Sequence, residues 1–402
     1  MKEFVSILIS FIFMSIADSI DAAFNNYISV DAVVVCGSLI FIKFMFKSIG
    51  EIGIYTHRVV RKDSSSYLLI SGIVGLILGT ISFLFSDLIV NLFNLTINQK
   101  ELLSNILKLY IIYLPISIVH VGLLEIVRLN NELKLYRKGL IITYISLISL
   151  DLLAFIFTRS LIALFIATIL SDIICFIYLS CKTKQKYKKI TKDELNNVKI
   201  YGIPYSIERI FSRTLILIYG ILASRLGTEK YSIHTICYSV CLTLEIITNA
   251  YQAALMIKVP EGKTYKQQYR NCMEMKNKCF PLIIILNFIF SFIYLIISHG
   301  SVPILKCFPY FLFYIITVFG LYQYETYKTL CITQGKSFIL LIGSTIGVII
   351  RILICLLFIN TSFALFIFGI VNCIDFYFRS IIYRISLYKL CNKDTVSEKL
   401  YA

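Results

Sequence analysis

Charged residues are scarce in this sequence. Only 15% of its 402 residues are Asp, Glu, Lys or Arg, whereas 58% are hydrophobic, and the mean hydropathy is +0.82. A soluble chain would be about one quarter charged, so the composition excludes an ordinary soluble domain. Apolar runs long enough to cross a hydrocarbon core of about 30 Å recur along the whole chain. The sequence therefore predicts an all-α integral membrane protein.

Several motifs of catalysis are also missing. The chain has no H-E-x-x-H, no G-x-S-x-G and no phosphate-cradling glycine loop, which argues against common hydrolases and against an ATP-driven pump. Its twelve cysteines include no C-x-x-C pair, so we expect neither a metal site nor a disulfide framework. Asp18 and Asp21 form one D-x-x-D motif, but prenyl-transfer enzymes use two such motifs and no second one occurs. We therefore expect no enzyme and no cofactor.

Twelve apolar segments are predicted to span the membrane. The first is expected to stay in the protein, because it is longer than the apolar part of a signal peptide and lacks a clear small-residue cleavage site. The predicted spans lie at about 4–24, 29–56, 67–90, 105–127, 139–158, 161–181, 200–223, 231–257, 279–298, 309–330, 337–359 and 362–388.

The distribution of Lys and Arg predicts the orientation. Most of these residues lie on one side of the spans, at Lys2, 58–62, 128–138, 182–199, 258–278, 328–336 and from Arg379 onward. The connections on the other side hold five, which are Lys100, Arg159, Arg225, Lys230 and Lys306. Basic loops face the cytoplasm, so both termini are predicted to be cytoplasmic. Orientation thus accounts for the net charge of +16, and no nucleic-acid partner is expected.

The longest basic connection, 182–199, falls at the midpoint of the chain. It would link an N-terminal half, 1–181, to a C-terminal half, 200–402, with six spans in each. An even number of spans gives both halves the same orientation. We therefore expect two six-helix lobes related by a pseudo-two-fold axis along the membrane normal. Similarity between 27–33 and 225–231, at a constant offset of 198 residues, supports this repeat.

The start of the C-terminal half carries a recognisable series of residues. A G-x-P motif is followed by about twenty apolar residues, then by R-L-G-T-E and a histidine; these residues are Gly202, Pro204, Arg225, Leu226, Gly227, Thr228, Glu229 and His234. The series resembles the seventh and eighth spans of the multidrug and toxic compound extrusion (MATE) family of secondary transporters. The resemblance implies a bacterial cytoplasmic membrane as the location. The amino-acid composition, which is rich in Ile, Lys, Tyr and Asn, is typical of a bacterial genome rich in A and T.

The N-terminal half resembles the same family in four fragments, which occur in the family's order. They are 20–37, 126–139, 148–157 and 166–172. The chain also departs from the family pattern. Ser6 lies near the place of a common proline, Leu147 replaces a common Asn, and Ser212 replaces the Glu of one subgroup. From this resemblance we interpret the sequence as a divergent member of the MATE family.

The resemblance implies a site for a coupling ion. Asp21 in span one and Asp151 in span five match the family's ion-site carboxylates, and Thr168 matches a hydroxyl in span six. Asp18 lies one helical turn from Asp21 on the same face. An ionised Asp inside a span costs about 2.5–3.5 kcal/mol, so such residues suggest function. They could exchange H⁺ or bind Na⁺, and no other metal is expected. The alternatives are salt bridges or packing hydrogen bonds.

Charged side chains in other spans predict a substrate cavity. They are Lys43 and Lys47 in span two, Glu208, Arg209 and Arg213 in span seven, and Glu245 in span eight, with Arg351 in span eleven. The family layout turns spans two and seven toward the centre, where basic residues favour an anionic or amphipathic cargo. The alternative is internal ion pairing, such as Lys47 with Glu51, together with snorkelling. A lone membrane histidine such as His120 is more often a packing residue than a proton relay.

These observations predict an ion-coupled secondary active exporter of small amphipathic or drug-like molecules, working by H⁺ or Na⁺ antiport and alternating access. Its partners would be membrane lipid and the small-molecule cargo, and since the fold needs no other chain, we expect a monomer. The alternative is a flippase for a lipid-linked saccharide or another anionic lipid precursor. The basic cavity residues favour the flippase, whereas Asp21 and the L-G-T-E motif favour the exporter.

Overall fold

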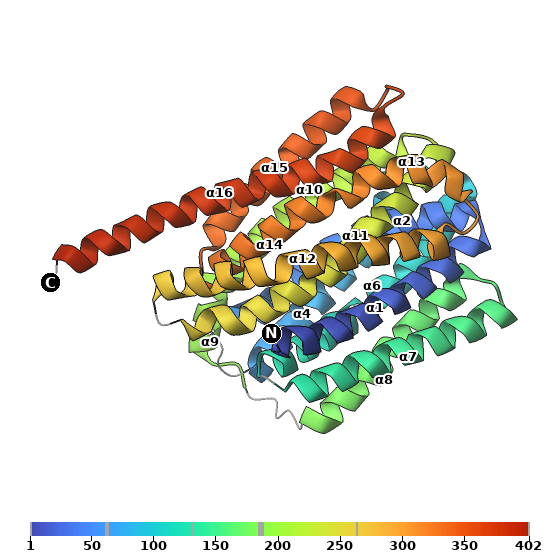
Figure 1. The fold of residues 1–402 in the computed structure, drawn as a ribbon. Helices are drawn as coiled ribbons and strands as arrows, with labels where there is room; N and C mark the ends of the chain where they lie inside the picture. The colour runs from blue at the N-terminus through green and yellow to red at the C-terminus, as the bar shows by residue number, and fades with distance from the viewer. Residues whose placement is uncertain (1, 61–63, 131, 184–188, 263, 401–402) are drawn as a thin grey trace.

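The computed structural model describes residues 2–60, 64–130, 132–183, 189–262 and 264–400 (Figure 1). These residues form a bundle of helices with short connections, and no strand occurs among them. The N-terminal half contains α1 (Lys2–Ile28), α2 (Val30–Gly50), α3 (Ile52–Val60), α4 (Ser64–Leu84), α5 (Ser86–Asn91), α6 (Ile97–Leu129), α7 (Leu133–Phe157) and α8 (Leu161–Thr183). The predicted all-α fold class is confirmed.

The C-terminal half follows a short helix and a π-helical turn, α9 (Lys192–Asn197) and η1 (Val198–Gly202). It contains α10 (Ile203–Ser224), α11 (Thr228–Lys258), the 3₁₀ turn η2 (Val259–Glu261), α12 (Tyr265–Ser298), α13 (Ile304–Ile315), α14 (Thr317–Thr333), α15 (Ser337–Phe358) and α16 (Ala364–Leu400). Both chain ends lie at the same end of the bundle (Figure 1).

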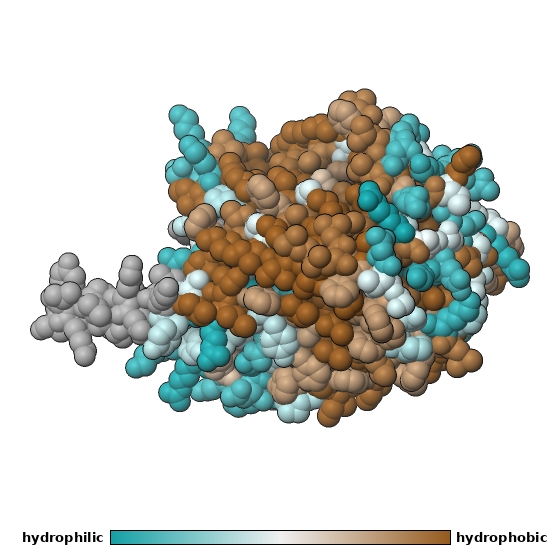
Figure 2. Space-filling view, turned by 90° about the horizontal axis from the view of Figure 1, so that it is seen from above, coloured by the Kyte–Doolittle hydropathy of each residue, from teal (hydrophilic) through white to brown (hydrophobic). Residues whose placement is uncertain are grey.

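Eleven helices in the described part of the chain are long and apolar enough to cross a membrane. The remaining predicted span is α10, which has 22 residues and includes three charged positions, Glu208, Arg209 and Arg213. On the face shown in Figure 2, apolar side chains form a broad band across the middle, and hydrophilic residues gather at both ends. This surface suits a bilayer whose normal follows the helix axes.

Packing within the two halves follows one pattern. In the first half α1 packs on α7, α7 on α8, and α6 on both α2 and α8. In the second half α10 packs on α15, α15 on α16, and α14 on both α11 and α16. Between the halves α1 meets α11 while α2 meets α10, as a two-fold relationship requires. The predicted two-lobe architecture is therefore present in the packing.

The second span of each half begins in the same way. Asp31 at the start of α2 accepts a hydrogen bond of 2.6 Å from Gln99 Nε2 of α6. Glu229 at the start of α11 pairs with Lys306 of α13 at 2.5 Å. Each carboxylate lies at a helix N-terminus, where the helix dipole favours negative charge. Gly227 precedes α11 with φ of 86°, a conformation that glycine adopts without a Cβ clash, so the L-G-T-E motif has a structural role here.

The structure corrects several expected boundaries. Span two is broken at Glu51 into α2 and α3, and span ten begins earlier, as α13 followed by α14. The basic segment 258–278, expected to be a connection, is helical from Tyr265 onward as the first turns of α12. Hydropathy predicted the starts of spans nine and ten too late in the chain. A helix that continues beyond the apolar core does so with polar residues, and their composition resembles that of a loop.

Candidate functional site

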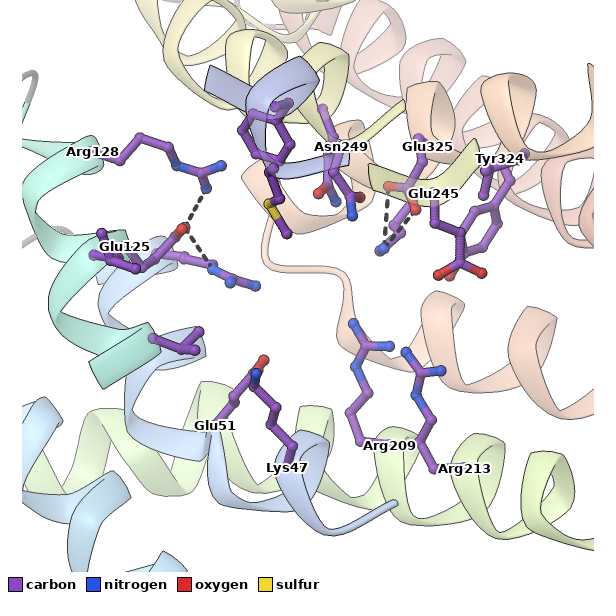
Figure 3. A pocket seen from close by; sticks show the side chains of 18 of the residues that line it. Lys47, Glu51, Glu125, Arg128, Arg209, Arg213, Glu245, Asn249, Tyr324 and Glu325 are labelled. Carbon is purple, nitrogen blue, oxygen red and sulfur yellow. Dashed lines mark hydrogen bonds and ion pairs between the residues drawn. The ribbon is translucent and has the colours of Figure 1, made fainter. Parts of the chain in front are cut away.

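A cavity of about 400 Å³ lies between the two halves. Eight Lys and Arg residues and five Asp and Glu residues line it, so we call it the charged cavity. Glu51 at the end of α2 and Arg128 at the end of α6 place it toward the end of the bundle with the basic connections. Figure 3 shows side chains from both halves pointing into it.

The N-terminal half presents one carboxylate between two arginines. Arg58 Nε donates to Glu125 Oε1 at 2.9 Å, and Arg128 Nη2 donates to the same oxygen (Figure 3). Glu125 and Arg128 are both buried in α6, three residues apart. Because two guanidinium groups share one carboxylate, this group carries a net positive charge.

The C-terminal half repeats part of this arrangement. Lys328 Nζ donates to both oxygens of Glu325 in α14, at 2.9 and 3.1 Å, again with a spacing of three residues. A second carboxylate, Asp375 of α16, is bound by Arg379 of the same helix and by Arg351 of α15. Internal pairing, one of the alternatives raised for Arg351, is what the structure shows.

Four of the predicted cavity residues line the charged cavity, namely Lys47, Arg209, Arg213 and Glu245 (Figure 3). The Arg209 Nε donates to the Tyr205 hydroxyl at 2.7 Å, and the Arg213 guanidinium lies 5.2 Å from the centre of the Phe44 ring. The side chain of Glu208 lies outside the described part of the structure. An ion pair between Lys47 and Glu51, offered as an alternative, does not occur in this part of the described chain.

A second cavity, of about 220 Å³, follows the first along the same helices. It contains three of the four predicted coupling residues, Asp18, Asp21 and Thr168, and we call it the carboxylate cavity. Lys43 lines this cavity and not the charged one where it was expected. The C-terminal half closes it with side chains of α11 and α12, including Thr235 and Tyr294.

The fourth predicted residue, Asp151, is fully buried and interacts electrostatically with Asp21. No described group donates to either oxygen of Asp151. Asp21 is held by Asn25 Nδ2, which donates to Asp21 Oδ1 at 3.0 Å. Two interacting buried carboxyl groups disfavour a second negative charge, so this pair can hold one proton.

Thr168 and Lys43 define the remaining polar wall of the carboxylate cavity. The Thr168 hydroxyl donates to the carbonyl of Leu164 at 3.3 Å, within its own helix. The Lys43 ammonium lies 4.6 Å from the centre of the Phe165 ring and interacts electrostatically with Asp21. A lysine side chain therefore lies close to the proposed coupling carboxylate.

Sequence reasoning missed two acids inside the bundle, one of them fully buried. Asp172 of α8 accepts a hydrogen bond from the Tyr113 hydroxyl and lies 3.4 Å from His120 Nδ1. Asp375 is fully buried between its two arginines. An ionisable residue in a span suggests function. This rule made Asp18 and Asp21 candidates, and it applies equally to Asp172 and Asp375. Asp172 was overlooked because it ends a fragment, 166–172, that the resemblance had already explained.

Several hydrogen bonds join the halves at the end of the bundle opposite to the charged cavity. Asn26 Nδ2 donates to the Ser298 carbonyl at 2.7 Å, and the Ser301 amide donates to the Asn26 carbonyl at 3.0 Å. The Asn94 amide donates to the Ser224 hydroxyl at 3.1 Å. These hydrogen bonds join the halves at the end that the sequence predicts to face outward.

The sequence matches no protein-family profile and no curated protein, whereas the structure resembles solved transporters. A variant of the Vibrio cholerae MATE transporter VcmN superposes with a TM-score of 0.74 at 12% identity, covering 98% of this chain and 96% of that one. The chain has the MATE fold. The resemblance drawn from the sequence is thus confirmed at the level of the fold.

Two further structures show the same MATE fold. An inward-facing multidrug resistance MATE family transporter of the MOP superfamily has a TM-score of 0.67 at 13% identity, over 94% of this chain and 95% of that one. A MOP superfamily transporter from Pyrococcus furiosus, described as having a binding pocket of reverse polarity, has a TM-score of 0.69 at 13% identity, over 96% and 95%. The fold therefore extends over almost the entire chain.

Proposed function

We propose that this protein is an ion-coupled secondary active exporter of small amphipathic molecules. It would work as a monomer in a bacterial cytoplasmic membrane, with both termini in the cytoplasm, and exchange its cargo for H⁺ or Na⁺. The Asp21–Asp151 pair is the observation that carries this proposal. A buried acid pair next to a cavity between two lobes can bind a cation, and binding cancels negative charge in the membrane interior.

Coupling follows if the pair prefers one arrangement of the lobes when the cation is bound and another when it is free. A ligand shifts a conformational equilibrium only by its difference in affinity for the two states. Asp21 lies in α1, which packs on α7 of its own half and on α11 of the other half. Binding or release of a cation at Asp21 would therefore change the charge of a helix that packs between the lobes.

The charged cavity supports a site for cargo at the cytoplasmic end. Its lining has more positive than negative side chains, and Arg213 and Lys47 approach it from opposite halves. An amphipathic molecule with an anionic group fits this surface better than a simple organic cation. Alternating access would require the hydrogen bonds between the lobes at the opposite end to break when the cavity opens there.

The first test uses inverted membrane vesicles that carry the native chain or Asp21→Asn. An imposed H⁺ or Na⁺ gradient should drive uptake of a fluorescent anionic amphiphile by the native protein, and uptake should fall at least tenfold in the variant. The matched control is Asp87→Asn, the same substitution at a side chain that is 74% exposed and away from both cavities. Equal uptake by the native protein and Asp21→Asn would refute ion coupling through this residue.

A flippase for an anionic lipid precursor is the second candidate. The supporting observation is the pair of two-arginine groups around Glu125 and Asp375, one in each half, each with a net positive charge. Proteoliposomes with a fluorescent lipid phosphate would test it by the fraction of label protected from an impermeant quencher. Gradient-independent scrambling that survives Asp21→Asn would favour this candidate over the exporter.

A further inference from the structure

His120 and Asp172 form a polar pair inside the N-terminal half, at the wall of the charged cavity. His120 is 3% exposed, and neither of its ring nitrogens makes a hydrogen bond within the described part of the chain. Its Nδ1 lies 3.4 Å from Asp172 Oδ1. The other carboxylate oxygen of Asp172 is held by the Tyr113 hydroxyl, so Oδ1 stays turned toward the imidazole. Burying an imidazole without hydrogen bonds costs folding free energy, so its presence here suggests a functional role.

The groups around Asp172 come from four neighbouring helices. α6 contributes Tyr110, Tyr113 and His120, α1 contributes Asp18, α2 contributes Lys43 and Lys47, and α7 contributes Tyr144. Cys175 of α8 lies beside His120. Asp18 interacts electrostatically with Asp21 and with Asp172. Asp18 therefore interacts with both the predicted coupling pair and the His120–Asp172 pair.

The same residues mark the boundary between the two cavities. On α8 Thr168 lines the carboxylate cavity, and Asp172, one turn later, lines the charged cavity. On α2, Lys43 lines the carboxylate cavity and Lys47, one turn later, lines the charged cavity. One turn is about 5.4 Å, so the cavities are neighbours. Each is far larger than the roughly 10–15 Å³ of probe-occupied space that one water needs.

We propose that Asp18, Asp172 and His120 form a proton path between the Asp21–Asp151 pair and the charged cavity. The inference rests on the proposed function and names H⁺ as its coupling ion. The shared proton leaves the acid pair for Asp18, directly or through water in the carboxylate cavity. Asp18 passes one proton to Asp172 Oδ1, and His120 takes it at Nδ1 and releases one from Nε2 to water in the charged cavity. One proton leaves the acid pair and one enters the water.

The same geometry disfavours Na⁺. A hard cation needs several oxygen ligands at close range. Here Lys43 lines the same cavity as Asp21, so a lysine competes with Na⁺ for the carboxylate. A proton needs only the two carboxyl groups and a path of exchangeable groups. Asp172 and His120 receive the proton after Asp18 and carry it in this transfer.

The test measures proton exchange without cargo and without a membrane gradient. Purified protein is subjected to a rapid pH jump, and infrared difference spectroscopy follows the carbonyl band of protonated carboxyl groups. Asp21→Asn and Asp151→Asn identify the band of the acid pair. We expect His120→Gln and Asp172→Asn to slow its appearance at least tenfold while its final amplitude is retained. His57→Gln, a buried histidine that lines neither cavity, is the matched control.

A chemical rescue separates proton transfer from packing. In His120→Ala, free imidazole in the buffer should restore the rate, and Asp172→Glu should retain more of it than Asp172→Asn. Native rates in His120→Gln and Asp172→Asn would overturn the path, as would a protein in which no band of the acid pair forms. If His120→Gln does not fold, absence of rescue in His120→Ala overturns it. Export can fail in vesicles while this exchange persists, so the two proposals fail separately.

Discussion

Replacing Asp375 with Asn should be among the most destabilising single substitutions in the chain. Asp375 is fully buried, and its Oδ1 accepts from Arg379 Nε at 2.5 Å. Its Oδ2 accepts from Arg379 Nη2 at 2.8 Å and pairs with Arg351 Nη2 at 2.5 Å. Asn keeps the shape of the side chain but has one acceptor oxygen, and its amide hydrogens face guanidinium hydrogens.

The magnitude follows from what remains after the substitution. Removing one partner of a buried ion pair costs about 3–5 kcal/mol, since it leaves a buried charge uncompensated. Asp375→Asn leaves two such charges, Arg351 and Arg379, so we expect the upper part of this range. Asp87→Asn, at an exposed pair with Lys108, should cost at most about 1 kcal/mol.

The chain provides a suitable reporter for this measurement. It has no Trp, but its cysteines are mostly buried, among them Cys272, Cys279, Cys331 and Cys355. Titration of the micelle-bound protein with SDS, followed by the reactivity of these thiols, gives the free energy of unfolding for each variant. The double variant with Arg351→Gln should recover at least about 1 kcal/mol, because it removes one unpaired cation from a shared cluster. Equal stability of Asp375→Asn and Asp87→Asn would refute the argument.

Three other substitutions test the contacts between the halves and the coupling site. Thr168→Val should retain gradient-driven uptake in vesicles, because the hydroxyl bonds only to its own helix; loss of uptake would indicate an ion ligand. Asn26→Ala removes a hydrogen bond of 2.7 Å worth about 1 kcal/mol, so spin-label distances across the outer end should show a roughly fivefold larger open population. Gly37→Val would crowd Thr235 where α2 meets α11, at about 1–3 kcal/mol, and the same spin labels should show opening; unchanged distances would mean that the helices adjust.

The sequence predicted those features of the fold that depend on local composition. Spans and the two halves follow from apolar length and an even number of spans, and the all-α fold is confirmed, whereas the orientation inferred from the basic loops stays a prediction. Asp21 and Asp151 were found through a resemblance between short fragments, and in the structure the two interact electrostatically. The roles proposed for them stay predictions.

What the sequence could not supply is pairing across the membrane interior. Hydropathy counts Arg351 and Asp375 as two charges, although the structure makes them one compensated group. His120 could be judged only as a lone histidine until α8 was seen to bring Asp172 to it. Such pairs join different helices, and no local pattern encodes the distance between their side chains.

The charged residues of α10 affect how this helix enters the membrane during synthesis of the chain. Arg213 lies at the middle of this helix, where an arginine costs about 2.5–3.5 kcal/mol on insertion, and Glu208 and Arg209 precede it. In the folded protein α10 packs on α2 of the other half. We therefore expect α10 to enter the bilayer efficiently only when the earlier helices are already there to receive it. Synthesis from the N-terminus supplies them in that order, whereas a C-terminal half made alone would leave its first helix outside the membrane.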